Sequence, residues 1–421
     1  MRFIQYFRAW GVLAACLGLF LFHVKQSAGA PKWTDRNEYD LVLAVRAEAA
    51  PQKRLALLDQ WKAKYPKTEL RQTREELYLS VYQSLGDSPR MLAAAREMIS
   101  GAPDNLVGLY WYTLLVPEAK EAPADLLDAG EKAARRLLAG LDTYFAAGGK
   151  PAGTAPEAWQ KRRGEVEFLA HRALGWIQWQ RADYPGAAAE FTTCLHQDPN
   201  RAEISAWFGI VLAQDKDPAH QVPALWHLAR AASYRGSGAL PDAQRRQLSP
   251  VLERLYTTYH GETAGLDQVR IASVAAAFPP AGFDIESASA AALRRQDEEL
   301  SRTNPQLASW LGVRRHLEAA DGEAYFAETL HNKPLPMRWK GTLLRSAPPR
   351  KPQELVLGVG DATAEEVILK LETAFPNEAE PGAILEFEGT VEAFTKTPFT
   401  LTVLAGREKI EGWPAAARSR K

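Results

Sequence analysis

The chain has 421 residues, more than one hydrophobic core usually holds, so its length predicts two or three folded units. Hydrophobic residues make up 46% and charged residues 24%, which excludes a mainly disordered or membrane-embedded chain. The 51 basic residues balance the 51 acidic ones, so no overall field would draw the protein onto nucleic acid or acidic lipid. Nucleic acid is therefore an unexpected partner.

The first 30 residues have the plan of a secretory signal. Arg2 and Arg8 give a basic start, residues 9–24 are apolar with one exception, and small residues follow up to Ala30. The apolar run is shorter than the roughly 20 residues that a membrane-spanning helix needs. We expect residues 1–30 to be a signal peptide, or an N-terminal anchor if it is retained, and the protein to be exported to the periplasm or cell envelope.

The two cysteines carry different implications. Cys16 ends a short stretch, LAAC, similar to a bacterial lipobox, so lipidation stays open beside cleavage and retention. Without the leader Cys194 stands alone, and no intramolecular disulfide can form. The fold must then hold by packing, which suits helical repeats that stack on their neighbours.

A two-helix pattern is clearest over residues 168–200. Gly175 leaves room for a paired helix to approach, and Ala187 and Phe191 place a small residue against a large one on the second helix. Pro199 ends that second helix, because proline cannot continue it. The segment therefore predicts two antiparallel helices.

These residues at this spacing resemble the tetratricopeptide (TPR) repeat, a pair of helices in about 34 residues. Gly209 takes the place of Gly175 one period later, Tyr82 fits an earlier repeat, and Pro66 ends a looser one. The resemblance covers residues 37–235. It implies an α-solenoid whose concave surface binds a protein or peptide.

Residues 239–330 continue in helical periodicity without the TPR spacing. Breaks at GETAG, FPPAGFD and TNP separate the expected helices. We expect this helical extension to cap the end of the solenoid, because a terminal repeat must cover its apolar face.

The periodicity changes to alternation from residue 334 onward. The pattern predicts a strand over 338–345, a proline-rich loop, two more strands, an irregular piece over 374–379 and two final strands. This order resembles an OB-type barrel, and a small β-sandwich would produce nearly the same pattern. The predicted fold class is mainly α, with a TPR-type solenoid, a helical cap and a small OB-like or sandwich domain over 334–415.

No motif indicates an enzyme. The histidines lack metal-ligand spacing, and the glycine-containing turn at 358–361 lacks the third glycine and the helix of a dinucleotide loop. There is no phosphate loop and no serine nucleophile elbow. Cys194 takes a position that favours a buried, inert thiol. We expect no catalytic residue, cofactor or metal.

Arg172, Trp176 and Trp179 are the strongest candidates for partner binding. They take the fifth, ninth and twelfth positions of a first helix, which in TPR proteins line the concave groove, and aromatic and arginine side chains often anchor interfaces. Packing on the adjacent repeat is the alternative. The same positions in the repeat that begins at residue 72 are Glu76, Ser80 and Gln83.

The sequence thus predicts a non-catalytic, exported scaffold that binds a protein or peptide. The alternative is a binder of oligosaccharide or oligonucleotide through the OB-like domain. Acidic residues outnumber basic ones over 331–415, which argues against a surface that follows phosphates.

Overall fold

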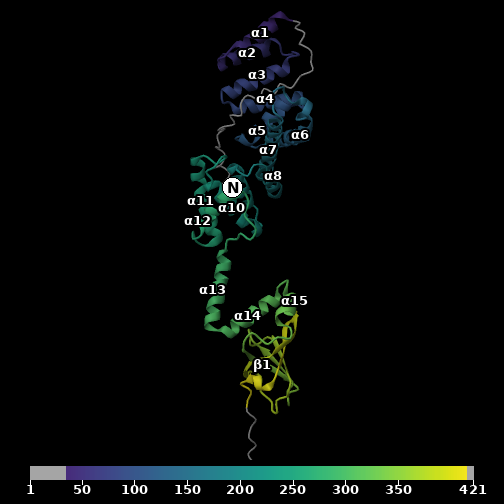
Figure 1. The fold of residues 1–421 in the computed structure, drawn as a ribbon, viewed down its shortest axis with the longest axis vertical. Helices are drawn as coiled ribbons and strands as arrows, with labels where there is room; N and C mark the ends of the chain where they lie inside the picture. Colours follow the sequence, from purple (N-terminus) through teal and green to yellow (C-terminus); the bar gives the residue numbers. More distant parts are fainter. Residues whose placement is uncertain (1–34, 415–421) are drawn as a thin grey trace, which may run out of the picture. The chain divides into compact units, whose positions relative to one another are not determined.

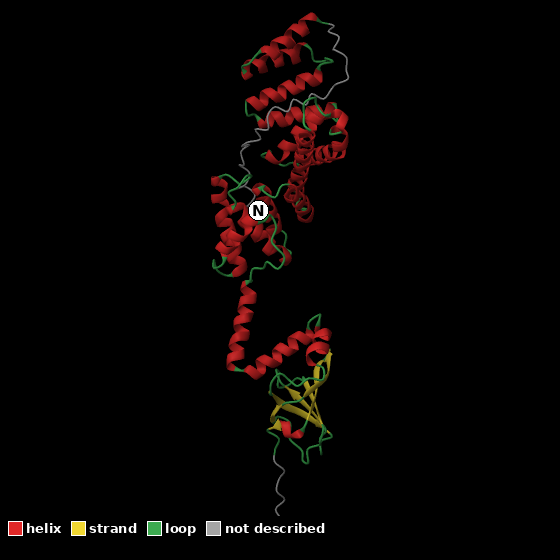
Figure 2. Ribbon diagram, in the orientation of Figure 1, coloured by secondary structure: helices red, strands yellow, loops and turns green. Residues whose placement is uncertain are grey.

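The computed structural model describes residues 35–414 (Figure 1). Residues 1–34 and 415–421 lie outside this part, so the predicted signal peptide or anchor over 1–30 does too. Within the described residues, fifteen α-helices precede a seven-stranded sheet (Figure 2). The predicted class, mainly α with a small C-terminal β domain, is confirmed at this level.

The chain divides into two compact units, Met1–Ile285 and Glu286–Lys421. The predicted helical extension over 239–330 spans this division. Its first two helices, α11 and α12, belong to the first unit, and the next three belong to the second. The helices concerned are α11 (Asp242–His260), α12 (Leu266–Ala275), α13 (Ala288–Thr303), α14 (Pro305–Glu318) and α15 (Gly322–Tyr325).

In the first unit each helix packs on the next one in chain order, from α1 to α10. The helices are α1 (Arg36–Ala47), α2 (Pro51–Lys64), α3 (Arg71–Ser84), α4 (Ser88–Gly101), α5 (Leu106–Leu115), α6 (Ala124–Tyr144), α7 (Pro156–Gln180), α8 (Tyr184–Gln197), α9 (Ala202–Gln214) and α10 (Gln221–Ser233). A short 3-10 helix, η2 (Val116–Glu118), follows α5. Contacts between helices that are not consecutive also occur in this unit: α5 packs on α7, α7 on α9, and α10 on α12.

A shift of 96 residues superimposes the bounds of two helices: α4 runs from 88 to 101 and α8 from 184 to 197. The turns before them match as well. Gly86 (φ 67°) and Ala182 (φ 59°) are both left-handed. Asp87 and Asp183 then cap the helices, each accepting a backbone N–H at 3.1 Å. Two segments that are 96 residues apart in the sequence thus have the same local structure: a left-handed turn residue, an Asp cap and a helix of equal length.

Helices approach closely at the two glycines that the repeat pattern singled out. A Cβ built on Gly175 would stand 2.6 Å from Cε1 of Phe191, and one on Gly209 would stand 2.9 Å from the backbone nitrogen of Leu228. Such distances admit no side chain without movement of the neighbour. The absence of a side chain therefore lets α7 reach α8, and α9 reach α10.

The second unit holds a sheet in the order β5-β6-β3-β2-β1-β4-β7. Neighbouring strands are antiparallel except β3 and β6, which are parallel. The strands are β1 (Trp339–Ala347), β2 (Glu354–Gly358), β3 (Val367–Leu371), β4 (Ile384–Phe387), β5 (Thr390–Lys396), β6 (Phe399–Ala405) and β7 (Ile410–Glu411).

Two of these strands, β5 and β7, are additional to the five predicted from the sequence. In β5 only Val391 is buried, and the register shifts between Val391 and Ala393. That irregularity breaks the alternation of apolar and polar residues on which the prediction depended. With two residues, β7 is too short to show any alternation.

Helix α14 belongs to the core of the β unit. Trp310 is fully buried, and its ring centroid lies 5.2 Å from that of Trp339 on β1 and 5.8 Å from that of Phe399 on β6. Val313 and Leu317 follow on the same side of α14 and join the same core. The sheet therefore shares its hydrophobic core with the helix that precedes it.

Candidate interaction face of the helical unit

Arg172, Trp176 and Trp179 lie together on α7, and each is only 7% exposed. Trp179 donates from Nε1 to Oε1 of Gln214 at 2.7 Å, and its ring lies 6.4 Å from that of Trp207. Both contacts reach α9. This burial favours the packing alternative for the two tryptophans over a role as exposed ligand anchors.

The guanidinium of Arg172 joins three elements. It donates to Oε1 of Glu118 at 2.9 Å and to both carboxylate oxygens of Glu203 at 3.0 and 2.9 Å. It also lies over the ring of Trp207, 4.7 Å from the centroid. Although burial disfavours the charge, Glu203 and Glu118 raise the pKa of Arg172. The arginine therefore stays charged and ties η2, α7 and α9 together.

The carboxylates beside Arg172 are incompletely compensated. Burial raises the pKa of Glu118, even though the Arg172 charge and hydrogen bond lower it. Burial also raises the pKa of Tyr110 on α5, and the nearby charge of Glu165 raises it further. Glu165 precedes Arg172 by two turns of α7, so both lie on one side of that helix. Two carboxylates, those of Glu118 and Glu203, thus share the one guanidinium of Arg172.

Glu76, Ser80 and Gln83 lie on α3 and are more accessible than their counterparts on α7. Glu76 and Ser80 are half-buried, and Gln83 is exposed. Glu76 accepts a hydrogen bond from Nε2 of Gln72 at 3.2 Å, and burial raises its pKa. In the described part of the chain no hydrogen bond joins the α3 residues to the α7 residues.

Cys194 and the metal-ligating side chains of residues 35–414 bear on possible chemistry. Cys194 is fully buried, and burial raises the pKa of its thiol, which keeps the thiol protonated and unreactive. Across residues 35–414, no three His, Cys, Asp or Glu side chains are grouped as a metal ion would require. Over the same residues, no helix is both long and apolar enough to cross a membrane.

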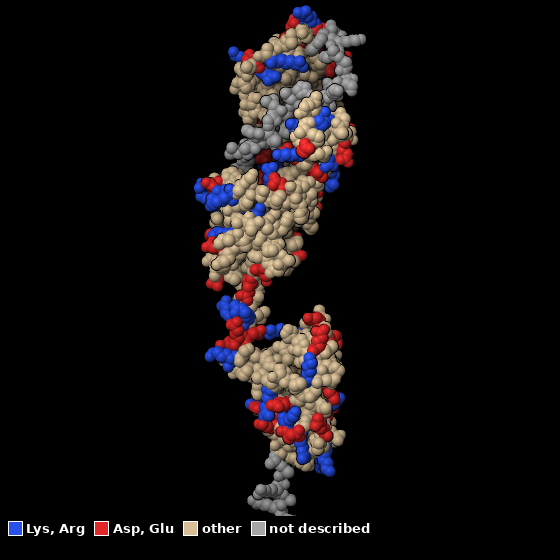
Figure 3. Space-filling model, viewed as in Figure 1, with Lys and Arg blue, Asp and Glu red and all other residues tan. Residues whose placement is uncertain are grey.

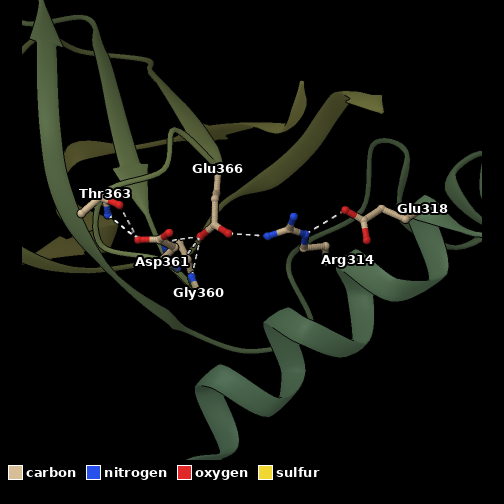
Figure 4. A network of polar contacts seen from close by, with 7 residues as sticks. Arg314, Glu318, Gly360, Asp361, Thr363 and Glu366 are labelled. Carbon is tan, nitrogen blue, oxygen red and sulfur yellow. Dashed lines mark hydrogen bonds and ion pairs between the residues drawn. The ribbon is translucent and has the colours of Figure 1, made fainter. Parts of the chain in front are cut away.

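The glycine-containing turn after β2 holds a carboxylate of the protein itself (Figure 4). Oε2 of Glu366 accepts the backbone N–H groups of Val359, Gly360 and Asp361 at 2.8, 2.5 and 3.0 Å. Its Oε1 accepts from Nη1 of Arg314 on α14 at 2.6 Å. Glu366 is 2% exposed, so this network pins α14 to the sheet and fills the anion site that the turn forms.

Sequence reasoning missed this network. The sequence indicates a turn between strands at 358–361 but does not indicate its partner, which is Glu366, the acidic residue directly before β3. A charged residue that adjoins a buried strand was the available signal, because a buried carboxylate needs several donors.

One row of residues crosses the sheet from β1 to β5, with Arg345, Val356, Ile368, Thr402 and Ala393 as successive partners. Of these five residues only Val356 is buried. This row has no aromatic side chain on which a base or sugar could stack. Arg345 pairs with Glu365 at 2.8 Å, and Lys370 pairs with Glu392 at 2.7 Å. Figure 3 shows basic and acidic side chains intermixed over this unit.

Comparison with protein-family models, with curated proteins and with solved structures finds no match for this chain.

Proposed function

We propose that the chain is an exported, non-catalytic scaffold of the TPR type whose helical unit binds a protein or peptide partner. The observation that carries this proposal is the repetition of one helix, cap and turn after 96 residues, from 88 to 184 and from 101 to 197. Repeated helix pairs that each pack on the next form extended surfaces suited to binding. The close contacts at Gly175 and Gly209 support a solenoid, because they occur where the repeat pattern requires them.

The sheet supports an OB-type barrel as the finer description of the second unit. Three antiparallel strands, β1 to β3, are followed by a parallel pairing of β3 with β6. The register of β1 shifts between Leu343 and Arg345, a bulge of the kind that lets a sheet curve. The alternative function, oligosaccharide or oligonucleotide binding, has weaker support, because the row from Arg345 to Ala393 lacks aromatic rings and because Arg345 and Lys370 are already paired.

The accessible positions on the first helices are the best candidates for partner contact. Gln83 is exposed and Ser80 half-buried, whereas Trp179 lies in the core. A partner that contacts α3 at these positions would meet polar side chains with free hydrogen-bonding capacity. The face that contains Glu76, Ser80 and Gln83 is therefore where the proposal can be tested.

A photo-reactive amino acid at Gln83 tests the binding surface. Ser100, an exposed residue on α4, is the matched control position. We expect irradiation of cells to join the Gln83 variant to one discrete partner, with little product from the Ser100 variant. Equal products from both positions, or none from either, would contradict binding through this face.

Export has a separate test. A C-terminally tagged chain should be recovered outside the cytoplasm, and its N-terminal sequence should begin near residue 31 if the leader is cleaved. A soluble cytoplasmic product that keeps Met1 would contradict export.

A further inference from the structure

A short segment, residues 276–285, follows α12 and ends the first unit at Ile285. We name this segment the strap. The ring centroid of Phe278 lies 4.8 Å from that of His196 on α8 and 5.6 Å from that of His227 on α10. Ile285, at the other end, is buried. The strap is therefore packed on the helices of its own unit.

The guanidinium of Arg230 on α10 holds the start of the strap. Its Nη1 donates to the carbonyl oxygens of Ser273, Val274 and Ala276 at 2.9, 3.0 and 3.1 Å. Among residues 35–414 no carboxylate pairs with this guanidinium, so carbonyl dipoles alone offset its charge. His227 lies one turn earlier on the same helix. A positive charge on His227 would therefore stand beside one that no carboxylate neutralises.

Three side chains of α10 that contact the strap or the end of α12 have an atom without a hydrogen-bond partner in the described part of the chain. The atoms are Nε1 of Trp226, Nδ1 of His227 and Nε of Arg230, and none of the three residues is more than 3% exposed. The ring of Trp226 lies 4.7 Å from that of Phe283 in the strap. A buried polar atom without a partner disfavours the state that buries it. Opening the strap would admit water to these atoms, which lowers the free energy that opening requires.

A proton on His227 would have no compensating group. The ring packs on Phe208 of α9, with centroids 4.3 Å apart, and on Phe278 of the strap. Burial and the like charge of Arg230 lower the pKa of His227 to about 3. His196 differs, because it is exposed and stacks on Phe278, where a charged imidazole keeps its water and favours the ring.

We propose that the strap is an acid-sensitive cap of the first unit, closed while His227 is neutral and released when His227 gains a proton. In the open state His227 reaches water and binds a proton from about pH 6.5 downward, whereas the closed strap excludes the proton. Because the open state binds more protons, its population rises as pH falls. The one acidic residue of the strap, Asp284, is exposed, and it adds to burial in raising the pKa of Tyr259 on α11. This device is independent of binding at α3.

Thiol labelling of the purified full chain measures the opening. Ala277→Cys places a reporter at a strap position that is 8% exposed, and Ala275→Cys, at an exposed position two residues earlier, is the matched control. The probe is dithiodipyridine, and the ratio of the two labelling rates cancels the effect of pH on thiol reactivity. We expect this ratio to rise about tenfold or more from pH 7 to pH 5, because only the open strap takes up the proton.

Two histidine variants, each combined with both reporters, decide which side chain is responsible. His227→Phe keeps a ring against Phe208 and Phe278 but cannot gain a proton, so the ratio should stay constant within about twofold. His196→Gln should keep the full rise. Mass spectrometry locates the labelled thiols, and Cys194, fully buried in the core of the unit, should stay unlabelled unless the whole unit unfolds.

An unchanged ratio between pH 7 and pH 5, or an equal rise in His227→Phe, would overturn the inference. Loss of the rise in His196→Gln would assign the effect to His196 and overturn it as well. Labelling of Cys194 as fast as position 277 at pH 5 would show global unfolding in place of a released strap. If His227→Phe does not fold, His227→Met supplies a flexible apolar side chain for the same comparison.

Discussion

Helices α3 and α4 and helices α7 and α8 solve one packing problem in opposite ways. Leu79 and Ala95 take the positions that Gly175 and Phe191 take 96 residues later, with 79 matching 175 and 95 matching 191. The large residue is on the first helix in one pair and on the second helix in the other. All but glycine are among the buried hydrophobic residues of one core cluster. In both pairs one large and one small side chain share the space between the helices, and the helix that supplies the large side chain differs.

The same shift of 96 residues relates two candidate site residues, Gln83 and Trp179. Gln83 on α3 is exposed, whereas its counterpart Trp179 on α7 is buried and bonded to Gln214 of α9. Two positions that are 96 residues apart thus differ: Gln83 faces solvent, whereas Trp179 faces a neighbouring helix. The side chain and the next helix together decide whether a position can serve binding.

Trp179→Ala should produce the largest effect in this comparison. Removal of a buried indole from the core is expected to reduce the free energy of unfolding by about 3 to 5 kcal/mol. Denaturant unfolding of the first unit measures it. A loss below about 1 kcal/mol would mean that the ring is not a core residue and would restore it as a ligand anchor.

Gly175→Leu tests the volume exchange. The new side chain would meet Phe191, and overpacking of this kind costs about 1 to 3 kcal/mol. Adding Phe191→Ala recreates the arrangement of Leu79 and Ala95, so the double variant should be more stable than the sum of the two single effects predicts. Additive single effects in a double-mutant cycle would show that the two positions do not interact.

His227, which lies 96 residues after Glu131, should make the protein less stable in acid. His227 is buried, and burial and the charge of Arg230 lower its pKa to about 3. The unfolded chain binds the proton from about pH 6.5 downward while the folded chain does not, so stability is lost as pH falls from there toward 3. The loss should reach about 2 kcal/mol at pH 5.

His227→Phe should remove this part of the pH dependence. Glu131→Gln is the comparison, since hydrogen bonds from Arg181 and Arg135 lower the pKa of Glu131, and its contribution is lost only at more acidic pH. Urea unfolding at pH 7 and pH 5 separates the two. An unchanged difference between pH 7 and pH 5 in His227→Phe would contradict the assignment.

Gln83→Ala should have the smallest effect on stability. An exposed side chain without core contacts usually changes the free energy of unfolding by less than about 0.5 kcal/mol. The same denaturant experiment as for Trp179→Ala measures it. A loss of unfolding free energy as large as that of Trp179→Ala would mean that Gln83, like Trp179, is a packing residue.

The sequence was informative where a pattern is local. Gly175, Phe191 and Pro199 predicted a helix pair because helix periodicity and proline act over a few residues. It could not decide between groove and core for Trp176 and Trp179, because both alternatives require the same periodicity. That choice depends on α9, a helix that lies further along the chain.

The β unit shows the same limit. Alternation predicted β1, β2 and β3, whereas the parallel pairing of β3 with β6 joins segments about 30 residues apart and leaves no periodic trace. The pin formed by Glu366 and Arg314 is likewise a contact between distant parts of the chain. Local patterns therefore found the elements, and long-range contacts determined which residues remained available for binding.

The most direct test measures unfolding and partner binding on the same two variants, Trp179→Ala and Gln83→Ala, with the partner that the photo-reactive residue at position 83 captures. If Trp179 is a core residue, Trp179→Ala loses about 3 to 5 kcal/mol of stability while its folded fraction binds that partner as before. If α3 carries the binding surface, Gln83→Ala keeps its stability within about 0.5 kcal/mol and binds the partner more weakly. The reverse result, lost binding in a stable Trp179→Ala and full binding in Gln83→Ala, would contradict both assignments.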